Sequence, residues 1–379
     1  NMRDFCGTVL LEKKFFITEE QAVTPAEILM GAFTDADKIY INGICCGSSY
    51  DRYAPRIYPV APGILRAGEN VVCIHLYVFR GRGGAMPGKQ YGIRFKKGKE
   101  RWLDLSGTWD AQIRKQMEYL PEKTFFNYMA SAMFNGMISP VSPYKICAVI
   151  YYQGESDVGH PNRYALEFRA LVNDWRKSWK EKQLPIIYVQ LAGFSDGNIK
   201  KQGTQWAEFR EVQRQAMEIE NTAMIQAYDV GEYNDLHPMD KKTLGMRAAL
   251  AVHKLVYGEK EECTGPQVRK IRLDRDKRVY AVFDQPLQTG SKKDGCELVS
   301  EVELRKANGD YKRAYVTVDG NEICAWLSDG EEPTGIRYAW KDCPMNICLY
   351  GKRGLPVIPF IKEWGRDAIY TGKICETYR

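Results

Sequence analysis

Short apolar runs separated by turn residues fill the first hundred positions of the chain. They cover residues 7–17, 38–47, 69–79 and 90–95, and Gly, Pro, Asn and Asp stand between them. Apolar and polar positions alternate along these runs, so Ile39 and Ile41 would share one face of a strand. Ile74 and Leu76 would do the same further on, with His75 on the opposite face. The pattern predicts a β-sandwich.

The pattern changes between about residues 145 and 258. Apolar stretches at 146–153, 184–191 and 222–230 alternate with helical patterns at 163–179, 205–219 and 241–258. In the first helical pattern the apolar residues recur at helical spacing; they are Leu166, Ala170, Leu171, Val172 and Trp175. Alternating strands and helices predict a parallel sheet with helices on both faces. Three such units make only part of an open α/β domain.

The chain returns to β-type runs after about residue 260. These runs lie at 268–283, 295–306, 313–327 and 334–340, and they predict a small C-terminal β-domain. The expected fold class is therefore α/β plus β. Its three parts are a β-sandwich at residues 1–110, a partial parallel sheet with flanking helices at 111–258, and a β-domain at 259–379.

Composition narrows the classes of function. A length of 379 residues favours more than one domain. The net charge is +6, but Lys and Arg are interleaved with Asp and Glu, so nucleic acid is a poor candidate partner. No apolar run reaches the length of a membrane span. The eleven Cys contain no CxxC pair, which indicates reduced thiols and favours a cytoplasmic location without fixing the compartment. No metal-ligand spacing or cofactor motif is present.

Polar residues follow the first apolar strand of the α/β part. They are the stretch QGESD, residues 153–157. Ligands of open α/β sheets sit beyond the carboxyl ends of the strands, so Gln153 can point its amide into such a crevice. Gly154 permits close backbone approach or a positive φ. The same letters also fit an ordinary strand-to-helix turn in which Asp157 is an N-cap.

The stretch NDLHP, residues 234–238, follows another apolar strand. Asp235 can accept the Nδ1–H of His237 and orient the imidazole as a general base. A surface His beside a helix N-cap is the competing interpretation. A base of this kind needs a nucleophile, and Ser195 matches a GxSxG pattern in GFSDG. A nucleophile elbow turns directly into a helix, however, and here the polar stretch NIKKQGTQ intervenes.

Several motifs together resemble the sialate O-acetylesterase family of SGNH-type carbohydrate esterases. They are DADKIYINGICCG, WLDLSGTWD, FNGMISPVSPYKICAVIYYQGESD, NDLHP and GIRYAW, and they occur in the family's order over nearly the whole chain. The resemblance implies that the sandwich is a galactose-binding-like, jelly-roll-like insertion, here incomplete. It also implies that the parallel sheet is the C-terminal half of an SGNH hydrolase domain.

The resemblance further implies a Ser-His-Asp esterase acting on acetyl esters of sugar hydroxyls, such as O-acetylated sialic acid or a related glycan. The family's nucleophilic serine lies in a GQSN motif upstream of the sandwich, and this sequence contains no GQSN. His237 and Asp235 would then work with a serine on a segment absent from this chain. Gln153, Gly154, Glu155 and Asn135 of the NGMI motif would bind the oxyanion or substrate, without metal or organic cofactor.

Two other functions compete with this one. The first is a carbohydrate-binding protein without catalysis, which would use the two β-domains. The second is an esterase whose nucleophile lies within the chain, at Ser195 or Ser156. The order Ser195, Asp235, His237 is the order of an α/β-hydrolase triad.

Overall fold

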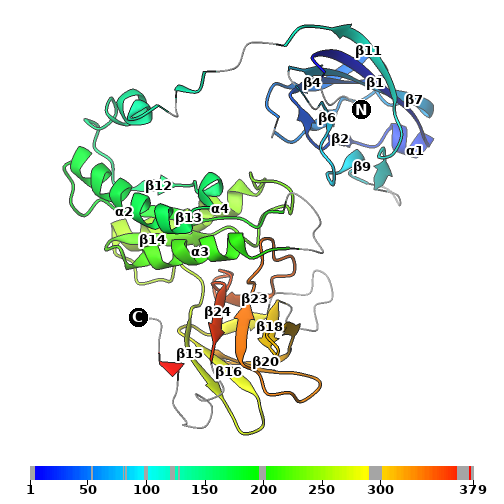
Figure 1. Ribbon diagram of the computed structural model, residues 1–379. Coiled ribbons are helices and arrows are strands. Elements are labelled where there is room, and N and C mark those ends of the chain that lie inside the picture. The colour runs from blue at the N-terminus through cyan, green and yellow to red at the C-terminus, as the bar shows by residue number, and fades with distance from the viewer. Residues whose placement is uncertain are drawn as a thin grey trace. The chain divides into compact units, whose positions relative to one another are not determined.

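The computed structural model describes residues 5–52, 54–79, 81, 83–97, 101–119, 124–126, 129–195, 202–289, 301–364 and 375–376. The chain divides into two compact units, residues 1–126 and residues 127–379 (Figure 1). Strands make up most of the regular structure. No helix within the described ranges is long and apolar enough to cross a membrane.

Two antiparallel sheets share one core in the first unit. The larger sheet has the spatial order β11 (Asp110–Gln116), β1 (Gly7–Ile17), β7 (Gly68–Val78), β4 (Ala36–Ile41), β5 (Ile44–Ser49). The smaller one has the order β10 (Trp102–Asp104), β9 (Tyr91–Phe95), β2 (Ala26–Met30), β6 (Ile57–Val60). A helix, α1 (Glu19–Ala22), and the pair β3 (Phe33–Thr34) and β8 (Gly84–Ala85) complete the unit. Both sheets contribute to the buried cluster, which confirms a β-sandwich.

The alternation seen in the sequence is confirmed in this unit. Ile39, Ile41, Ile74 and Leu76 are buried, whereas His75 is exposed. The sandwich extends past the expected boundary at residue 110, because β11 pairs with the free edge of β1. All seven side chains of β11 are exposed, so its sequence carries no alternation that would have revealed it.

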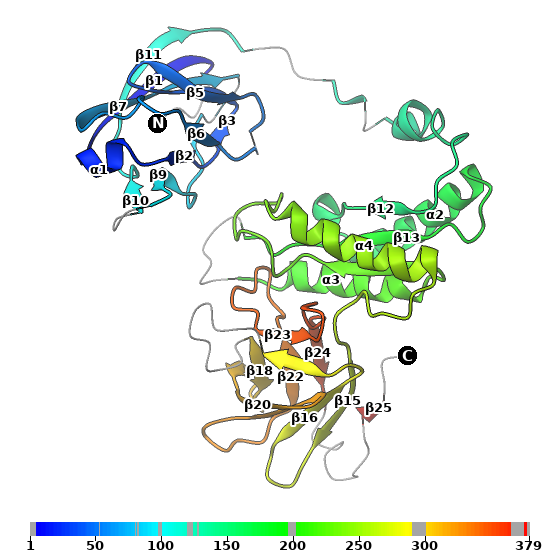
Figure 2. The same cartoon turned by 180° about the vertical axis from the view of Figure 1, so that it is seen from behind.

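The second unit begins with a three-stranded parallel sheet. Its strands are β12 (Val149–Tyr151), β13 (Ile186–Gln190) and β14 (Thr222–Gln226), in that spatial order. The helices are α2 (Pro161–Ser178), α3 (Gln205–Gln215) and α4 (Lys241–Tyr257). Ile186 and Tyr188 of β13 pack with α2 and α3, and Ile187 and Val189 pack with α4. Helices on both faces of a parallel sheet are thus confirmed (Figures 1 and 2).

The buried face of α2 agrees in part with the one expected. Val172 is buried, and Leu171 and Trp175 pack partly buried against the same core. Leu166 is 74% exposed, however, and Tyr164 and Phe168 are buried instead. The Phe168 ring lies 4.9 Å from the Tyr188 ring on β13, so aromatic packing onto the sheet determines the orientation of the helix. The hydropathy pattern had given more weight to the leucine than to these aromatic residues.

One edge of the parallel sheet is uncovered in the described chain. The strand β12 pairs with β13 on one side only. Ile150 at its centre is 58% exposed, because α4 lies against β13 and β14. The preceding segment adds more exposed apolar side chains: Met129, Met133, Phe134, Met137, Val141, Tyr144 and Ile146. An apolar surface of this kind is typical of a site that another polypeptide covers.

A β-domain follows the parallel sheet, as expected. One sheet has the order β20 (Tyr315–Asp319), β21 (Glu322–Trp326), β16 (Val279–Phe283), β15 (Val268–Leu273), β25 (Cys375–Glu376). The other has the order β19 (Tyr311–Arg313), β18 (Val302–Arg305), β22 (Gly335–Tyr338), β24 (Phe360–Glu363), and β17 (Leu287–Thr289) pairs with β23 (Leu349–Gly351). Residues 295–300 of one expected run lie outside the described residues.

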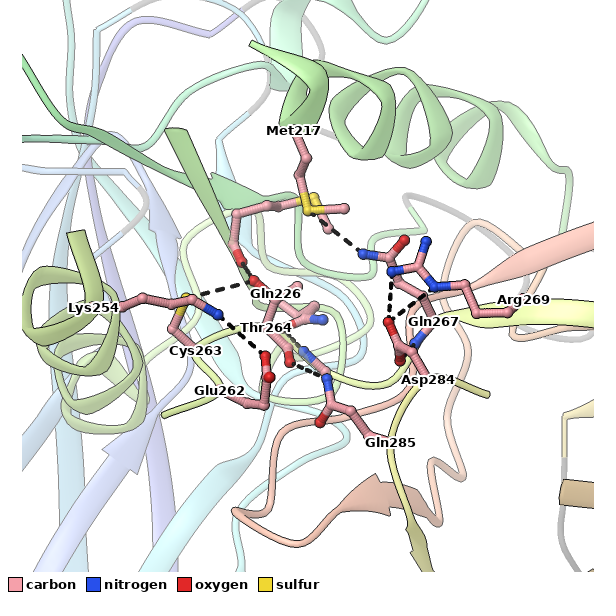
Figure 3. A network of polar contacts seen from close by, with 12 residues as sticks. Met217, Gln226, Lys254, Glu262, Cys263, Thr264, Gln267, Arg269, Asp284 and Gln285 are labelled. Carbon is pink, nitrogen blue, oxygen red and sulfur yellow. Dashed lines mark hydrogen bonds and ion pairs between the residues drawn. The ribbon is translucent and has the colours of Figure 1, made fainter. Parts of the chain in front are cut away.

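The β-domain is tied to the parallel sheet by a polar network at residues 262–269. Figure 3 shows Thr264, whose Oγ1 donates to the Met224 carbonyl at 2.9 Å while its own carbonyl accepts from Gln285 Nε2 at 3.0 Å. A second tie is Arg210 of α3, which is fully buried and donates to the carbonyls of Lys341 and Asp342. The β-domain is therefore joined to the parallel sheet through β14 and through α3.

Candidate active site

Three loops leave the parallel sheet at the carboxyl ends of its strands. They are residues 152–157 after β12, 191–195 after β13 and 227–240 after β14. Two contacts join them. The Ser195 N–H donates to the Tyr233 carbonyl at 2.5 Å, and the Lys241 ammonium lies 5.3 Å from the centre of the Tyr152 ring. The loop that carries His237 therefore contacts the loop of Ser195, and the first residue of α4, directly after it, lies over Tyr152.

Asp235 and His237 form a tight turn in this loop. Asp235 is 7% exposed, whereas His237 is exposed. The Asp235 Oδ1 accepts the main-chain N–H of His237 at 2.8 Å. A carboxylate has two oxygens, so the same group can also serve the imidazole Nδ1–H. The buried acid thus holds the exposed base at a fixed place on the protein surface.

The side chain of Gln153 is oriented by two neighbours. Its Oε1 accepts from the Tyr151 hydroxyl at 2.7 Å, and its Nε2 donates to Asp157 Oδ2 at 3.0 Å. Arg163 in turn donates to Asp157 Oδ1 at 3.1 Å. Burial raises the pKa of Tyr151 to about 12, so its hydroxyl stays protonated as a donor at neutral pH. An amide nitrogen carries two N–H groups, and the bond to Asp157 uses one of them.

Gly154 occupies a position that only glycine fits. Its φ is +151°, and a Cβ there would lie 2.7 Å from Cε1 of Phe209 in α3. The Gly154 N–H donates to Oε2 of Glu155 at 3.0 Å, so its single hydrogen is already bonded to this carboxylate. The short 3₁₀ turn Glu155–Asp157 follows.

The interpretation of Asp157 as an N-cap is wrong. Helix α2 starts only at Pro161, and His160 is its N-cap residue. The carboxylate of Asp157 binds the side chains of Gln153 and Arg163 instead. These two bonds make Asp157 part of the support of Gln153.

The two candidate nucleophiles within the chain lie on these loops. Ser195 is half-buried, and the neighbouring Phe194 is anchored by its N–H to the Asp342 carbonyl at 3.3 Å. The next helix in the described ranges, α3, begins at Gln205, and residues 196–201 lie outside them. Ser156 is exposed within the 3₁₀ turn. The described residues therefore contain no strand–serine–helix elbow at either position.

Asn135 lies apart from the three loops. It belongs to the exposed helical turn Phe134–Ile138, which precedes β12. The Tyr144 carbonyl accepts from Trp179 Nε1 at 3.0 Å, and Trp179 ends α2 at the amino end of the sheet. Both views place this helical turn on the opposite side of the sheet from the carboxyl ends (Figures 1 and 2).

Some residues at this site carry no signal in the sequence. Lys241 and Tyr233 join the loops by contacts that no motif encodes. Asp240 could have been found, because an Asp before a helical pattern is a common N-cap, and it accepts from the Thr243 N–H at 2.9 Å. No group of three or more His, Cys, Asp or Glu in the described part of the chain is placed to hold a metal ion.

Comparison with known proteins agrees with these observations. Residues 111–254 match the family of sialic acid-specific acetylesterases among the carbohydrate esterases. The sialate O-acetylesterase of Mus musculus is 31% identical over 275 residues, which are 62% of this chain and 47% of that protein. The human sialate O-acetylesterase is 28% identical over 264 residues, 61% of this chain and 48% of that protein. The chain is therefore similar to sialate O-acetylesterases, and the family match lies within residues 111–254.

A solved structure supports the same fold. A carbohydrate acetylesterase from Xanthomonas citri aligns with 90% of this chain and 96% of its own length, with a TM-score of 0.56 and 21% identity. At that identity the likeness shows the fold alone. The chain spans about half the length of the curated relatives it matches.

Proposed function

We propose that this chain provides the general base and the oxyanion donors of an esterase that removes acetyl groups from sugar hydroxyls. O-acetylated sialic acid, or a related acetylated glycan, is the proposed substrate, since the relatives are sialate O-acetylesterases. The observation that carries the proposal is the Asp235–His237 turn, on a loop that contacts the loop of Ser195 and leads directly into Lys241, which lies over the Tyr152 ring.

The proposed reaction proceeds through an acyl-enzyme. A serine Oγ attacks the acetyl carbonyl while His237 takes its proton, and Asp235 stabilises the resulting imidazolium. The second N–H of Gln153 and a main-chain N–H bind the oxyanion. The tetrahedral intermediate collapses, the ester C–O bond breaks, and His237 returns the proton to the sugar oxygen. Water, activated by His237, then attacks the acetyl-serine and releases acetate.

We further propose that the serine comes from a polypeptide segment outside these 379 residues. The edge of β12 supports this. Among the described strands β12 pairs only with β13, and its Ile150 is exposed, so the edge would accept another parallel strand. Such a strand would end beside Gln153 and could present a side chain to His237. The parallel layer would then be the C-terminal half of an SGNH hydrolase domain, and the sandwich a jelly-roll-like, galactose-binding-like insertion into it.

Asn135 could join the site only in that completed form. The helical turn that carries it is exposed and apolar in the present chain, with Met133, Phe134 and Met137 in solvent. Burial of these side chains against an added segment would give a reason for the turn to move. We propose a substrate-binding role for Asn135 on that basis.

The competing function with an in-chain nucleophile is supported by the hydrogen bond from the Ser195 N–H to the Tyr233 carbonyl, which brings this serine near the loop of His237.

The test of the proposed function measures acetate release from an aryl acetate and from an O-acetylated sugar. The chain is assayed alone and together with the polypeptide that its gene encodes upstream. A fluorophosphonate then labels the reactive serine, and peptide mapping locates the label.

Each outcome of this test is decisive. Activity only with the upstream polypeptide, and label on that polypeptide, supports the proposal. Strong activity of the chain alone with label on Ser195 or Ser156 overturns the external serine and retains the esterase. No activity in either arm overturns the esterase itself and favours a carbohydrate-binding protein without catalysis.

A further inference from the structure

An open hollow of about 390 Å³ lies beside β9 and β10 of the smaller sandwich sheet. Its lining residues come from β9, β10 and the residues beside them: Arg94, Phe95, Lys96, Arg101 and Trp102. Strand pairing sets Arg94 directly between Trp102 on one side and Glu27 on the other. A volume of this size is within the range of small-ligand sites.

Trp102 forms an aromatic platform at this hollow. Its indole lies against Gly92, where a Cβ would come within 2.5 Å of Cζ2. The absence of that side chain lets the ring lie close to the strand, and 40% of Trp102 stays exposed. A large ring that packs against the protein on one side and is exposed on the other offers an apolar surface to a flat ligand. Little side-chain entropy is lost on binding, because the ring is already held in place.

The described charges that line the hollow are positive. They belong to three cationic side chains, of which Arg94 donates to Glu27 at 2.8 Å and Lys96 forms an ion pair with Glu27 at 3.7 Å. The hydrogen bond from Arg94 lowers the pKa of Glu27, so this carboxylate is ionised at neutral pH and neutralises one of the three charges. Asp104 lies further along β10 and instead binds Ser106.

We propose that this hollow binds a carboxylated sugar, with the sugar ring on the Trp102 indole and the carboxylate facing Arg101 and Lys96. Arg pairs with carboxylates in a planar, bidentate geometry, and an exposed indole favours the C–H face of a ring. A nucleic acid would need a longer basic track than these few residues provide. The choice of a sugar as the carrier of the carboxylate rests on the proposed function. The preference for an anion and the aromatic platform rest on the residues that line the hollow.

The test is a calorimetric titration of the full chain with the methyl α-glycoside of sialic acid, which carries no acetyl ester. Methyl β-galactoside and inorganic phosphate serve as the neutral and the anionic comparison ligands. We expect saturable binding of the carboxylated sugar, and weakening by about tenfold or more in Trp102→Ala and by several-fold in Arg101→Gln. Tyr50→Ala, which removes an exposed aromatic side chain elsewhere in the same sandwich, should leave the affinity unchanged.

The possible results separate this site from the proposed esterase. His237→Ala should bind the sugar normally, and Trp102→Ala should leave hydrolysis of a small aryl acetate unchanged in the enzyme completed by its serine. The proposal is overturned if the neutral sugar or phosphate binds as tightly as the carboxylated sugar, or if Trp102→Ala does not weaken binding. Binding that is lost in His237→Ala would place the ligand at the hydrolytic loops and also overturn it.

Discussion

The buried carboxylate of Asp235 accepts the main-chain N–H of His237 at 2.8 Å, and the imidazole two residues away lies exposed at the carboxyl end of the sheet. The acid therefore organises the backbone that carries the base. Removal of the acid would leave this main-chain donor without that acceptor, which would destabilise the turn.

The first prediction concerns His237 in the enzyme completed by its serine. His237→Ala should lower kcat/KM for an aryl acetate by about 10³-fold or more, because the serine loses its proton acceptor. The control is His253→Ala, since His253 lies on the surface of α4 with its Nδ1 2.7 Å from Glu259. Equal activity of the two variants would exclude His237 as the base.

The second prediction concerns the orientation of Gln153. Tyr151→Phe removes the hydroxyl that donates to Gln153 Oε1, so we expect kcat to fall by about tenfold with little change in KM. Gln153→Ala should cost about 10²–10³ in kcat, as loss of an oxyanion donor does. Tyr257→Phe, at the exposed end of α4, is the matched control. Steady-state kinetics with an aryl acetate measure all three, and a Tyr151→Phe variant with normal kcat would argue against this support.

The third prediction concerns Gly154. Gly154→Ala should destabilise the second unit by about 2 kcal/mol or more, because it combines a strained positive φ with a close contact to Phe209. Gly159→Ala should change stability by less than about 0.5 kcal/mol, since a Cβ there meets nothing within 4 Å. Urea unfolding of both variants compares them, and similar midpoints would show that position 154 tolerates a side chain.

The fourth prediction concerns the N-cap of α4. Asp240 accepts from the Thr243 N–H and hydroxyl, so Asp240→Ala should destabilise the fold by about 1 kcal/mol at neutral pH. These bonds, the hydroxyl first, lower the pKa of Asp240 below its ordinary value of 3.8. The stabilisation is therefore complete above about pH 4 and is lost as pH falls through the folded-state pKa.

The fourth prediction is checked by unfolding wild type and variant between pH 3 and pH 7. The difference between the two proteins should narrow below about pH 4. Asp174→Ala is the control, because this exposed carboxylate pairs only with Lys177 at 3.6 Å on α2 and should matter little. A difference in the free energy of unfolding between wild type and Asp240→Ala that stays constant with pH would rule out stabilisation by the ionised N-cap.

The sequence was sufficient for features that depend on neighbouring residues. Alternation located β4 and β7, and the NDLHP letters located the turn of Asp235 and His237. The sequence was insufficient for features that depend on tertiary packing. Leu166 belongs to an apolar pattern but is exposed, since Phe168 packs on Tyr188, and the contact between Ser195 and Tyr233 joins two loops that no local signal connects.

The last prediction concerns the uncovered edge of β12. If a strand of the upstream segment pairs there, Ile150→Glu should abolish acetate release on mixing while the chain itself unfolds at the same urea concentration as wild type. Ile150 is 58% exposed in the present chain, so a charge at this position costs little until a partner buries it. Leu166→Glu is the matched control, because Leu166 is an exposed apolar residue on the outer face of α2, away from the edge. Full complementation by Ile150→Glu would show that the serine-bearing segment binds elsewhere, and loss of complementation in both variants would show a general sensitivity to surface charge.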